Sequence, residues 1–134
     1  IPSSNSEMAK NLFLLGNYFV NDSYRSKSKQ MLLNVQENAH QNMYFYSNWG
    51  VVELNFISDF YEVAIVGENF KTKREELDKL YLPNILLVGG KEEGTLELLQ
   101  DRLVADQTTI YVCSNGACKL PAKETYEAIK QIKE

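Results

Sequence analysis

The stretch EVAIVG at residues 62–67 decides the fold class of the second half of the chain. Two further short apolar runs follow, NILLVGG at residues 84–90 and TIYVC at residues 109–113, and a polar segment with helical periodicity separates the first two runs. Continuous apolar runs of this length, separated by helices, are typical of strands buried on both faces of a parallel sheet. We therefore predict an α/β fold with a small parallel sheet of about three strands, joined by right-handed βα crossovers.

Helices are expected to cover the faces of this sheet. The polar segment that ends at Leu80 has helical periodicity, and a shorter helix is expected around residues 95–100. A terminal helix after Pro121 is marked by Tyr126, Ile129 and Ile132. Together these elements predict a small α/β segment over residues 60–134.

The beginning of the chain has the pattern of an αα-hairpin. Ser4 and Glu7 are three residues apart and fit a capping box that starts a helix. The apolar face of this helix is predicted to contain Met8, Leu12, Leu15 and Phe19. Turn residues follow at 21–23, and the buried face of a second helix is predicted to contain Tyr24, Met31, Leu32, Val35 and Ala39.

Aromatic and aliphatic residues are dense between residues 42 and 59. They are too many for a one-sided stripe, and Gly50 alone gives too little turn punctuation for strands. This pattern predicts a third helix that is buried on several sides. Residues 1–59 are therefore expected to be helical and to pack with residues 60–134 as one compact unit.

Charge and apolar content favour neither nucleic acid nor a membrane as a partner. The 134 residues include 14 basic and 18 acidic side chains, which leaves a net charge of −4 and no positive excess to neutralise phosphates. Apolar runs are no longer than about four residues, whereas about 20 are needed to span a bilayer. The chain opens with Ile1-Pro2 and not with Met, so we expect that another segment precedes it.

Two predicted turns end in glycine, at residues 66–67 and 88–90. Neither turn has the G-x-G-x-x-G spacing of a dinucleotide site, and the sequence contains no G-x-x-x-x-G-K-[ST] motif. The glycines are therefore interpreted as residues that permit tight turns and close packing. No cofactor is expected.

Cys113 and Cys118 enclose an Asn-Gly turn signal that would bring their sulfur atoms close together. Structural free thiols in a reducing compartment are the favoured interpretation, and the cytoplasm is the expected location. A disulfide or redox pair is the alternative, although the spacing is not C-x-x-C and Lys119 is the only adjacent charge. No metal site is expected, because a tetrahedral zinc site needs four ligands and His40 is the only histidine.

Other candidate groups have simpler interpretations. His40 could act as an acid or base beside a carboxylate, but a place at a helix end, near carbonyl groups, is favoured. The acidic pairs at residues 75–76 and 92–93 are interpreted as solvated charges. Trp49 and the surrounding tyrosines are interpreted as core in preference to a carbohydrate pocket.

Two stretches of the chain resemble one known family. IPSSNS at residues 1–6, followed by the αα-hairpin, and YVCSNGACKLP at residues 111–121 are similar to the C-terminal part of the thioredoxin-domain-containing family that includes spermatogenesis-associated protein 20. The resemblance implies a thioredoxin-like domain followed by an (α/α)6 toroid, like that of N-acylglucosamine 2-epimerases and six-hairpin glycosidases. Residues 1–59 would form the end of the toroid, and the α/β segment would follow it.

Three functional hypotheses follow from the resemblance. The leading one is a non-catalytic C-terminal structural domain whose partner is the remainder of its own parent chain. In the second, Cys113 and Cys118 form a redox accessory module that exchanges disulfides with the parent's thioredoxin-like domain. In the third, the chain contributes Ser4 and Asn5 to a carbohydrate-binding or epimerase-like pocket of the toroid. Helices without their toroid neighbours would leave apolar side chains uncovered, so these side chains are expected to pack on the sheet layer or, by self-association, against a second copy.

Overall fold

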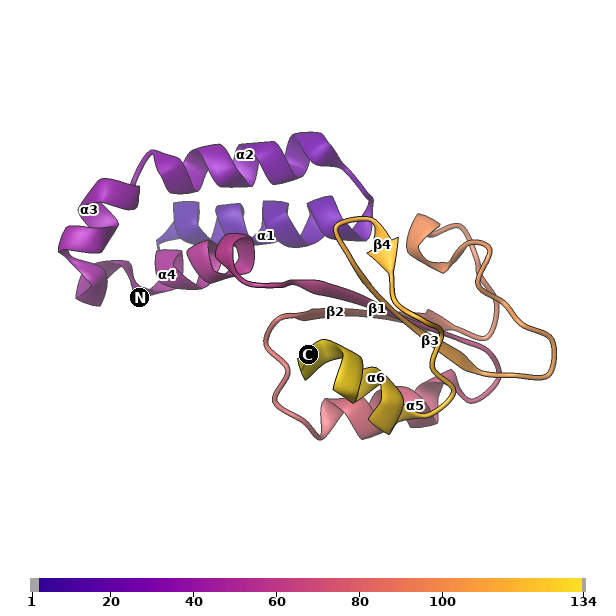
Figure 1. Ribbon diagram of the computed structural model, residues 1–134. Coiled ribbons are helices and arrows are strands. Elements are labelled where there is room, and N and C mark those ends of the chain that lie inside the picture. The colour runs from indigo at the N-terminus through magenta and orange to yellow at the C-terminus, as the bar shows by residue number, and fades with distance from the viewer. Residues whose placement is uncertain (1–2, 134) are drawn as a thin grey trace. The chain divides into compact units, whose positions relative to one another are not determined.

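The chain forms two compact units, one that ends at Asp59 and one that begins at Phe60. The computed structural model describes residues 3–133 (Figure 1). The first unit is helical and the second combines helices with a sheet, so the predicted α/β class is confirmed. Among the described residues, no helix has both the length and the apolar content that crossing a membrane requires.

Residues 3–59 of the first unit form four helices: α1 (Ser4–Tyr18), α2 (Asp22–Leu33), α3 (Gln36–Gln41) and α4 (Met43–Ile57). The first two helices lie side by side as the predicted αα-hairpin (Figure 1). A turn at residues 34–35 ends the second helix earlier than predicted and separates it from α3. A kink interrupts α4 at Tyr46, where φ is −112° and ψ is 18°.

The N-terminal cap of α1 is Ser3 and not Ser4. The Ser3 hydroxyl accepts a hydrogen bond from the Ser6 N–H at 3.2 Å, so the capping box predicted for Ser4 and Glu7 is wrong by one residue. The Glu7 carboxylate instead accepts a hydrogen bond from the side-chain amide of Asn48 at 3.1 Å, and the same amide donates to the Ser6 hydroxyl at 2.8 Å. The first turn of α1 is therefore tied to α4.

The buried face of α1 consists largely of small and polar residues and not of the predicted apolar stripe. In that stripe Leu12 is half-buried, and the other members are exposed: Met8, Leu15 and Phe19. The buried residues of the helix are Ser6, Ala9, Phe13, Gly16 and Asn17. The Ser28 hydroxyl on α2 donates to the Ala9 carbonyl at 2.7 Å. Small side chains on this face let the two helices approach closely, because the separation of packed helices depends on the side chains at the contact.

Most of the aromatic segment is exposed, which contradicts the prediction of a helix buried on several sides. Trp49 and Val52 are the buried residues of α4, and they pack with Ala9 and Leu32. Tyr44 and Phe45 have exposed fractions of 89% and 82%. Tyr46 and Phe56 of the same helix are half-buried against this cluster, and the Phe56 ring lies 4.9 Å from the Phe13 ring of α1.

The described part of the second unit, up to residue 133, contains four strands: β1 (Tyr61–Val66), β2 (Ile85–Gly90), β3 (Thr109–Ser114) and β4 (Ala117–Cys118). Their spatial order is β2-β1-β3-β4. The first two strands are parallel as predicted, but β3 is antiparallel to β1 and β4, so the all-parallel sheet is wrong. Residues 91–108 contain only one short 3₁₀ turn, η1 (Glu97–Leu99). A parallel return would need a longer crossover, usually a helix.

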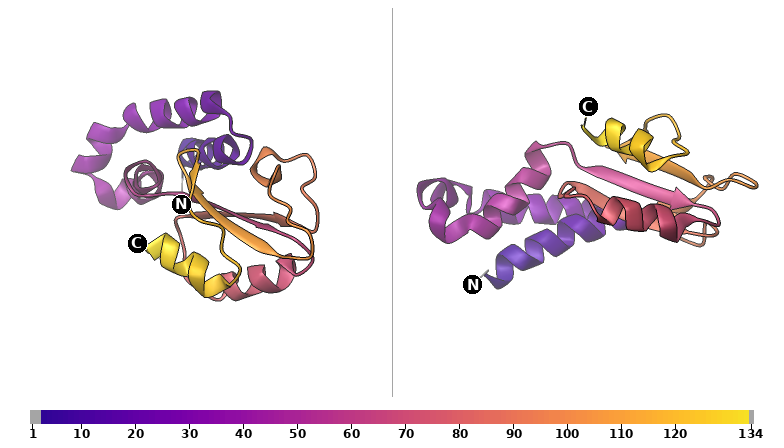
Figure 2. Two further views of the ribbon diagram at one scale, coloured as in Figure 1. Left: turned by 45° about the vertical axis from the view of Figure 1, so that its right-hand side comes forward. Right: turned by 90° about the horizontal axis from the view of Figure 1, so that it is seen from below.

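Both helices of this unit, α5 (Phe70–Asp78) and α6 (Thr125–Lys133), cover the same face of the sheet (Figure 2). The core beneath them is built from alternate strand residues and from apolar side chains of the helices: Tyr61, Val63, Ile65, Ile110, Val112, Leu77, Ala128 and Ile132. Successive side chains of a strand point to opposite faces. The strand residues between these, including Glu62, Tyr111 and Cys113, therefore point to the face that these helices leave uncovered.

The end of β1 is packed so closely that only glycine fits. Gly67 has a φ of 129°, and a Cβ atom at this position would lie 2.4 Å from the Gln107 carbonyl oxygen and 2.7 Å from Thr108 Cα. The chain then turns into α5, and the N–H of Asn69, just before this helix, donates to the Thr108 hydroxyl at 2.9 Å. This glycine serves backbone packing between β1 and the start of β3.

Candidate functional site

A disulfide joins Cys113 and Cys118 in the hairpin between β3 and β4. The turn residues Asn115 and Gly116 have φ values of 52° and 79°, the two positive values that a type I′ turn requires. This turn places the two cysteines directly opposite each other, with their Cα atoms 3.9 Å apart. The favoured interpretation of free thiols is therefore wrong, and the structure has the disulfide that was the alternative.

The two sulfur atoms differ in accessibility. Cys113 lies in β3 and is 2% exposed, because β1 and β4 flank its strand. Cys118 lies in the short edge strand β4 and is exposed. A thiolate from solution is therefore expected to react at Cys118, the exposed cysteine, in preference to Cys113.

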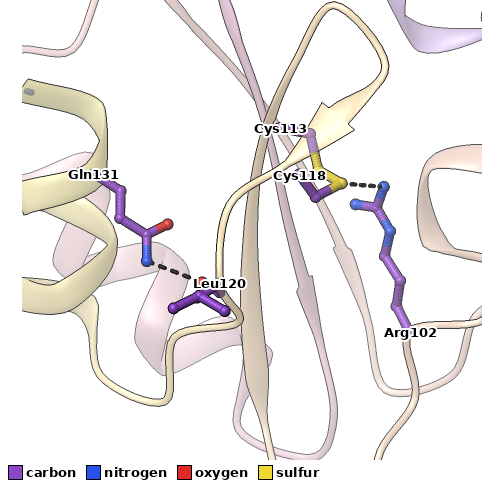
Figure 3. The surroundings of a disulfide bond; sticks show 5 residues. All are labelled: Arg102, Cys113, Cys118, Leu120 and Gln131. Atoms are coloured by element: carbon purple, nitrogen blue, oxygen red, sulfur yellow. Dashed lines mark hydrogen bonds between the residues drawn. A yellow bond between two sulfur atoms is a disulfide. The ribbon is translucent and has the colours of Figure 1, made fainter.

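The guanidinium group of Arg102 points at the sulfur of Cys118 (Figure 3). Its Nη2 atom donates to Cys118 Sγ at 3.5 Å. The same group lies 5.3 Å from the ring centroid of Tyr111, and the Tyr111 hydroxyl donates to the Arg102 carbonyl at 3.0 Å. Burial lowers the pKa of Arg102, and the nearby carboxylate of Glu62 opposes this effect. A guanidinium stays charged at neutral pH, so a positive charge adjoins the exposed sulfur.

One donor of Arg102 has no acceptor in the oxidised protein. Its Nη1 atom is buried, and none of the groups in residues 3–133 accepts a hydrogen bond from it. A buried donor without an acceptor raises the free energy of the folded state. A thiolate at Cys118 would supply a negative charge beside this guanidinium, through the atom that already accepts from Nη2.

Glu93 fixes the loop that carries Arg102. Its Oε1 atom accepts hydrogen bonds from the backbone N–H groups of Arg102 at 2.7 Å and Leu103 at 2.6 Å. The hydrogen bond from Leu103, and to a lesser degree the one from Arg102, lowers the pKa of Glu93 below its usual value. The carboxylate is therefore ionised at neutral pH. Glu93 is therefore more than the solvated charge predicted from the sequence.

Glu62 lies near both the buried cysteine and Arg102. It is directly opposite Cys113 in the β1–β3 register and shares its face of the sheet, with only 8% of the residue exposed. A neighbouring carboxylate disfavours a thiolate, whereas a neighbouring guanidinium favours one. After reduction, the negative charge is therefore expected on Cys118, beside Arg102, and the proton on Cys113.

A hollow of about 860 Å³ lies in the first unit, between the start of α1 and the kinked part of α4. The polar part of its lining includes Asn5 and Asn48, and the aromatic part includes Tyr44, Phe45 and Trp49. Of the two predicted pocket residues, Asn5 lines this hollow. Ser4 is exposed in the first turn of α1 and does not belong to the lining.

His40 has a carboxylate partner that the sequence did not indicate. Its Nε2 atom lies 2.9 Å and 3.1 Å from the two carboxylate oxygens of Glu53 on α4. Gln36 donates to the same carboxylate at 2.9 Å. The hydrogen bonds from Gln36 and His40 lower the pKa of Glu53. His40 lies in the last turn of α3, as predicted, but its side chain contacts the Glu53 carboxylate in place of carbonyl groups and connects α3 to α4.

Sequence reasoning identifies the two cysteines but misses the side chains that surround them. Arg102 and Glu93 lie in an irregular loop between β2 and β3, where neither strand nor helix periodicity predicts a direction for a side chain. Glu62 could have been identified as a polar residue within an apolar strand. Comparison of the chain with protein-family models, curated proteins and solved structures gives no match.

Proposed function

We propose that the chain is a redox accessory domain that exchanges disulfides through Cys118 and Cys113 and catalyses no other reaction alone. The supporting observation is the asymmetry of the disulfide. Its exposed sulfur accepts a hydrogen bond from Arg102, and its other sulfur is buried next to Glu62 in the strand register. This arrangement favours the second hypothesis over a purely structural domain, since a structural disulfide needs no adjacent cation.

The exchange reaction assigns a different role to each cysteine. In the reduced protein the Cys118 thiolate attacks a sulfur of a partner disulfide, forms a mixed disulfide and releases the partner's second sulfur as a thiolate. The Cys113 thiol then loses its proton to water and attacks Cys118 Sγ. The Cys113–Cys118 bond forms again, and the partner leaves as a dithiol. In the reverse direction a partner thiolate attacks Cys118, and Cys113 departs and takes up a proton.

The family resemblance supplies a partner for this proposal. Two stretches of the chain resemble the thioredoxin-domain-containing family. One includes the start of α1, and the other includes the disulfide hairpin. We propose that the first unit is the end of an (α/α)6 toroid, and that the dithiol partner is the thioredoxin-like domain of the parent chain. A cytoplasmic location, which we retain as part of the proposal, suits a transient disulfide, because persistent disulfides are rare there.

Trapping of a mixed disulfide tests this function. The oxidised chain is mixed with an excess of a thioredoxin-like protein in which the second cysteine of C-x-x-C is replaced by Ser, so that the partner cannot resolve the mixed disulfide. Acid is then added to stop its reversal by Cys113. We expect a covalent complex, and peptide mapping by mass spectrometry should locate the bond at Cys118. A structural disulfide would give no complex, and a bond at Cys113 would contradict the assigned roles.

The hollow beside α1 supports a second candidate function, the binding of a carbohydrate. Exposed aromatic rings and amide side chains occur together in its lining, and both groups are suited to sugar binding. Calorimetric titration with monosaccharides and oligosaccharides should then detect binding that Asn5→Ala removes. Ser4→Ala is the matched control, because Ser4 is adjacent but lies outside the lining.

A further inference from the structure

The backbone of Cys118 faces the outer edge of the sheet. The Lys119 N–H donates to the Val112 carbonyl at 2.8 Å, so these two residues form a hydrogen-bonded pair between β3 and β4. Such pairs alternate with non-hydrogen-bonded pairs in an antiparallel ladder, and the backbone groups of the latter point away from the partner strand. Cys113 and Cys118 form a non-hydrogen-bonded pair. Since β4 is the last strand of its sheet, the N–H and carbonyl of Cys118 point outward.

This open edge is short. Since Lys119 pairs with Val112, a regular antiparallel ladder would pair Pro121 with Ile110. Ala122 pairs with Ile110 instead, so the chain after β4 has one extra residue between the two pairs. The extra residue is a β-bulge, which interrupts the edge. Pro121 within it has no N–H to donate, and the Leu120 carbonyl accepts a hydrogen bond from Gln131 on α6 at 2.9 Å (Figure 3). Bulges and prolines are common protection against strand addition, and here the protection begins only after the reactive cysteine.

We propose that the substrate of this exchange is a cysteine within an extended peptide segment, which pairs with the Cys118 backbone as an added strand. This inference rests on the proposed redox function and names its substrate class. A residue paired with Cys118 by two backbone hydrogen bonds would have its Cα atom about 5.5 Å away. Disulfide-bonded cysteines have Cα atoms about 4.4–6.8 Å apart, so strand pairing brings the two sulfurs within bonding reach. Small thiols without a peptide backbone lack this orienting contact.

Backbone methylation of a peptide substrate tests the inference. The chain carries Cys113→Ser, so that Cys118 is the single thiol, and reacts with a synthetic extended peptide whose cysteine is activated as a thionitrobenzoate disulfide. A second peptide is methylated at the amide nitrogen of that cysteine, which would otherwise donate to the Cys118 carbonyl. A third is methylated at the next residue, whose N–H would point away from β4. Release of thionitrobenzoate gives the three rate constants.

Loss of one backbone hydrogen bond should slow the second peptide roughly fivefold to tenfold relative to the first and third. Equal rate constants for the second and third peptides would overturn strand pairing and leave the redox function intact. The small disulfide 5,5′-dithiobis(2-nitrobenzoate) tests the function separately. If Arg102→Gln leaves its reaction with Cys118 unchanged, the proposed function fails. Should Cys113→Ser unfold, reduction of the wild-type disulfide by the same three peptides as free thiols gives the same comparison.

Discussion

Glu53 holds the short helix α3 against α4 through Gln36 and His40. These hydrogen bonds lower the pKa of Glu53 below its ordinary value of 4.5. The ionised carboxylate is thus favoured by the folded state. Its contribution to stability is complete above pH 4.5 and is lost as the pH falls through the lower folded value.

We expect Glu53→Gln to flatten the acid dependence of stability in the helical unit. The free energy of unfolding is measured by urea titration with circular dichroism at a series of pH values from 6 to 3. The wild-type chain should lose more stability over this range than the variant. Glu37→Gln is the control, since Glu37 is an exposed acid on α3, the helix that Glu53 contacts. Identical slopes for wild type and Glu53→Gln would show that the contact is not formed.

Val20 occupies a backbone conformation that suits glycine. It follows α1 with a φ of 49°, and the Asn21 N–H returns to the Gly16 carbonyl at 2.7 Å, as in a Schellman motif. A β-branched residue is strained there by about 1–2 kcal/mol. Val20→Gly should raise the free energy of unfolding by about 0.5–1 kcal/mol, after the greater entropy of unfolded glycine is subtracted. Val51→Gly, in the regular part of α4, should lower it by about 0.5 kcal/mol, the difference in helix propensity. A loss of stability in both variants would refute the strain.

For single residues, the sequence predicts that the two cysteines lie close together, but it does not predict the charged side chains that affect their reactivity. The Asn-Gly turn is enough to bring Cys113 and Cys118 together, because the type I′ turn is a local property. The place of Arg102 depends on a long irregular loop and on its bonds to Glu93, which leave no pattern in the sequence.

The α1–α2 hairpin depends on close contact at one glycine. A Cβ atom on Gly16 would lie 2.5 Å from Arg25 Cγ and 2.9 Å from the Arg25 backbone nitrogen. Alanine there would force the helices apart, and Gly16→Ala should destabilise the unit by about 1–3 kcal/mol despite its better helix propensity. Gly50 offers the matched control, since its nearest contact would be Met43 Sδ at 3.4 Å.

Gly50→Ala should therefore stabilise the unit by about 0.5–1 kcal/mol, the usual gain from glycine to alanine in a helix. Thermal unfolding followed by circular dichroism at 222 nm measures both variants. An increase in midpoint temperature for both glycine variants would contradict the close packing of the hairpin.

The helices and strands are well predicted from the sequence, but the direction of β3 and the buried face of α1 are not. Short apolar runs identify β1, β2 and β3, and the polar helix after β1 makes the first pair parallel. The direction of β3 depends on residues 91–108, which form one 3₁₀ turn where a covering helix was expected. For α1 the apolar stripe is misleading, because close packing against α2 requires small residues at the contact, and these are Ala9 and Gly16.

The whole molecule exposes large apolar side chains on its helical unit. The most exposed include Met8, Phe19, Tyr44, Phe45 and Ile57. Patches of this kind favour association. Multi-angle light scattering should show a mass that increases with concentration, and Phe19→Ser should reduce the increase. Tyr81→Ser, in the other unit and more exposed to solvent than Phe19, should have a smaller effect. A constant mass of one chain at all concentrations would refute self-association.

The two-unit organisation separates the candidate sites. All residues of the disulfide site lie in the second unit, and all residues of the hollow lie in the first. Each function can therefore be removed by substitutions that leave the other unit unchanged. Asn5→Ala should not affect disulfide exchange, and Arg102→Gln should not affect sugar binding.

The pH dependence of Cys118 alkylation tests the central claim most directly. In the Cys113→Ser variant, the rate of reaction with iodoacetamide should reach half of its maximum at a pH below about 8.5, the ordinary value for a cysteine thiol. Adding Arg102→Gln should move this midpoint upward, since the stabilising charge is removed. A midpoint near that of an unfolded cysteine, and unchanged by Arg102→Gln, would contradict activation of Cys118 and leave the disulfide with a structural role only.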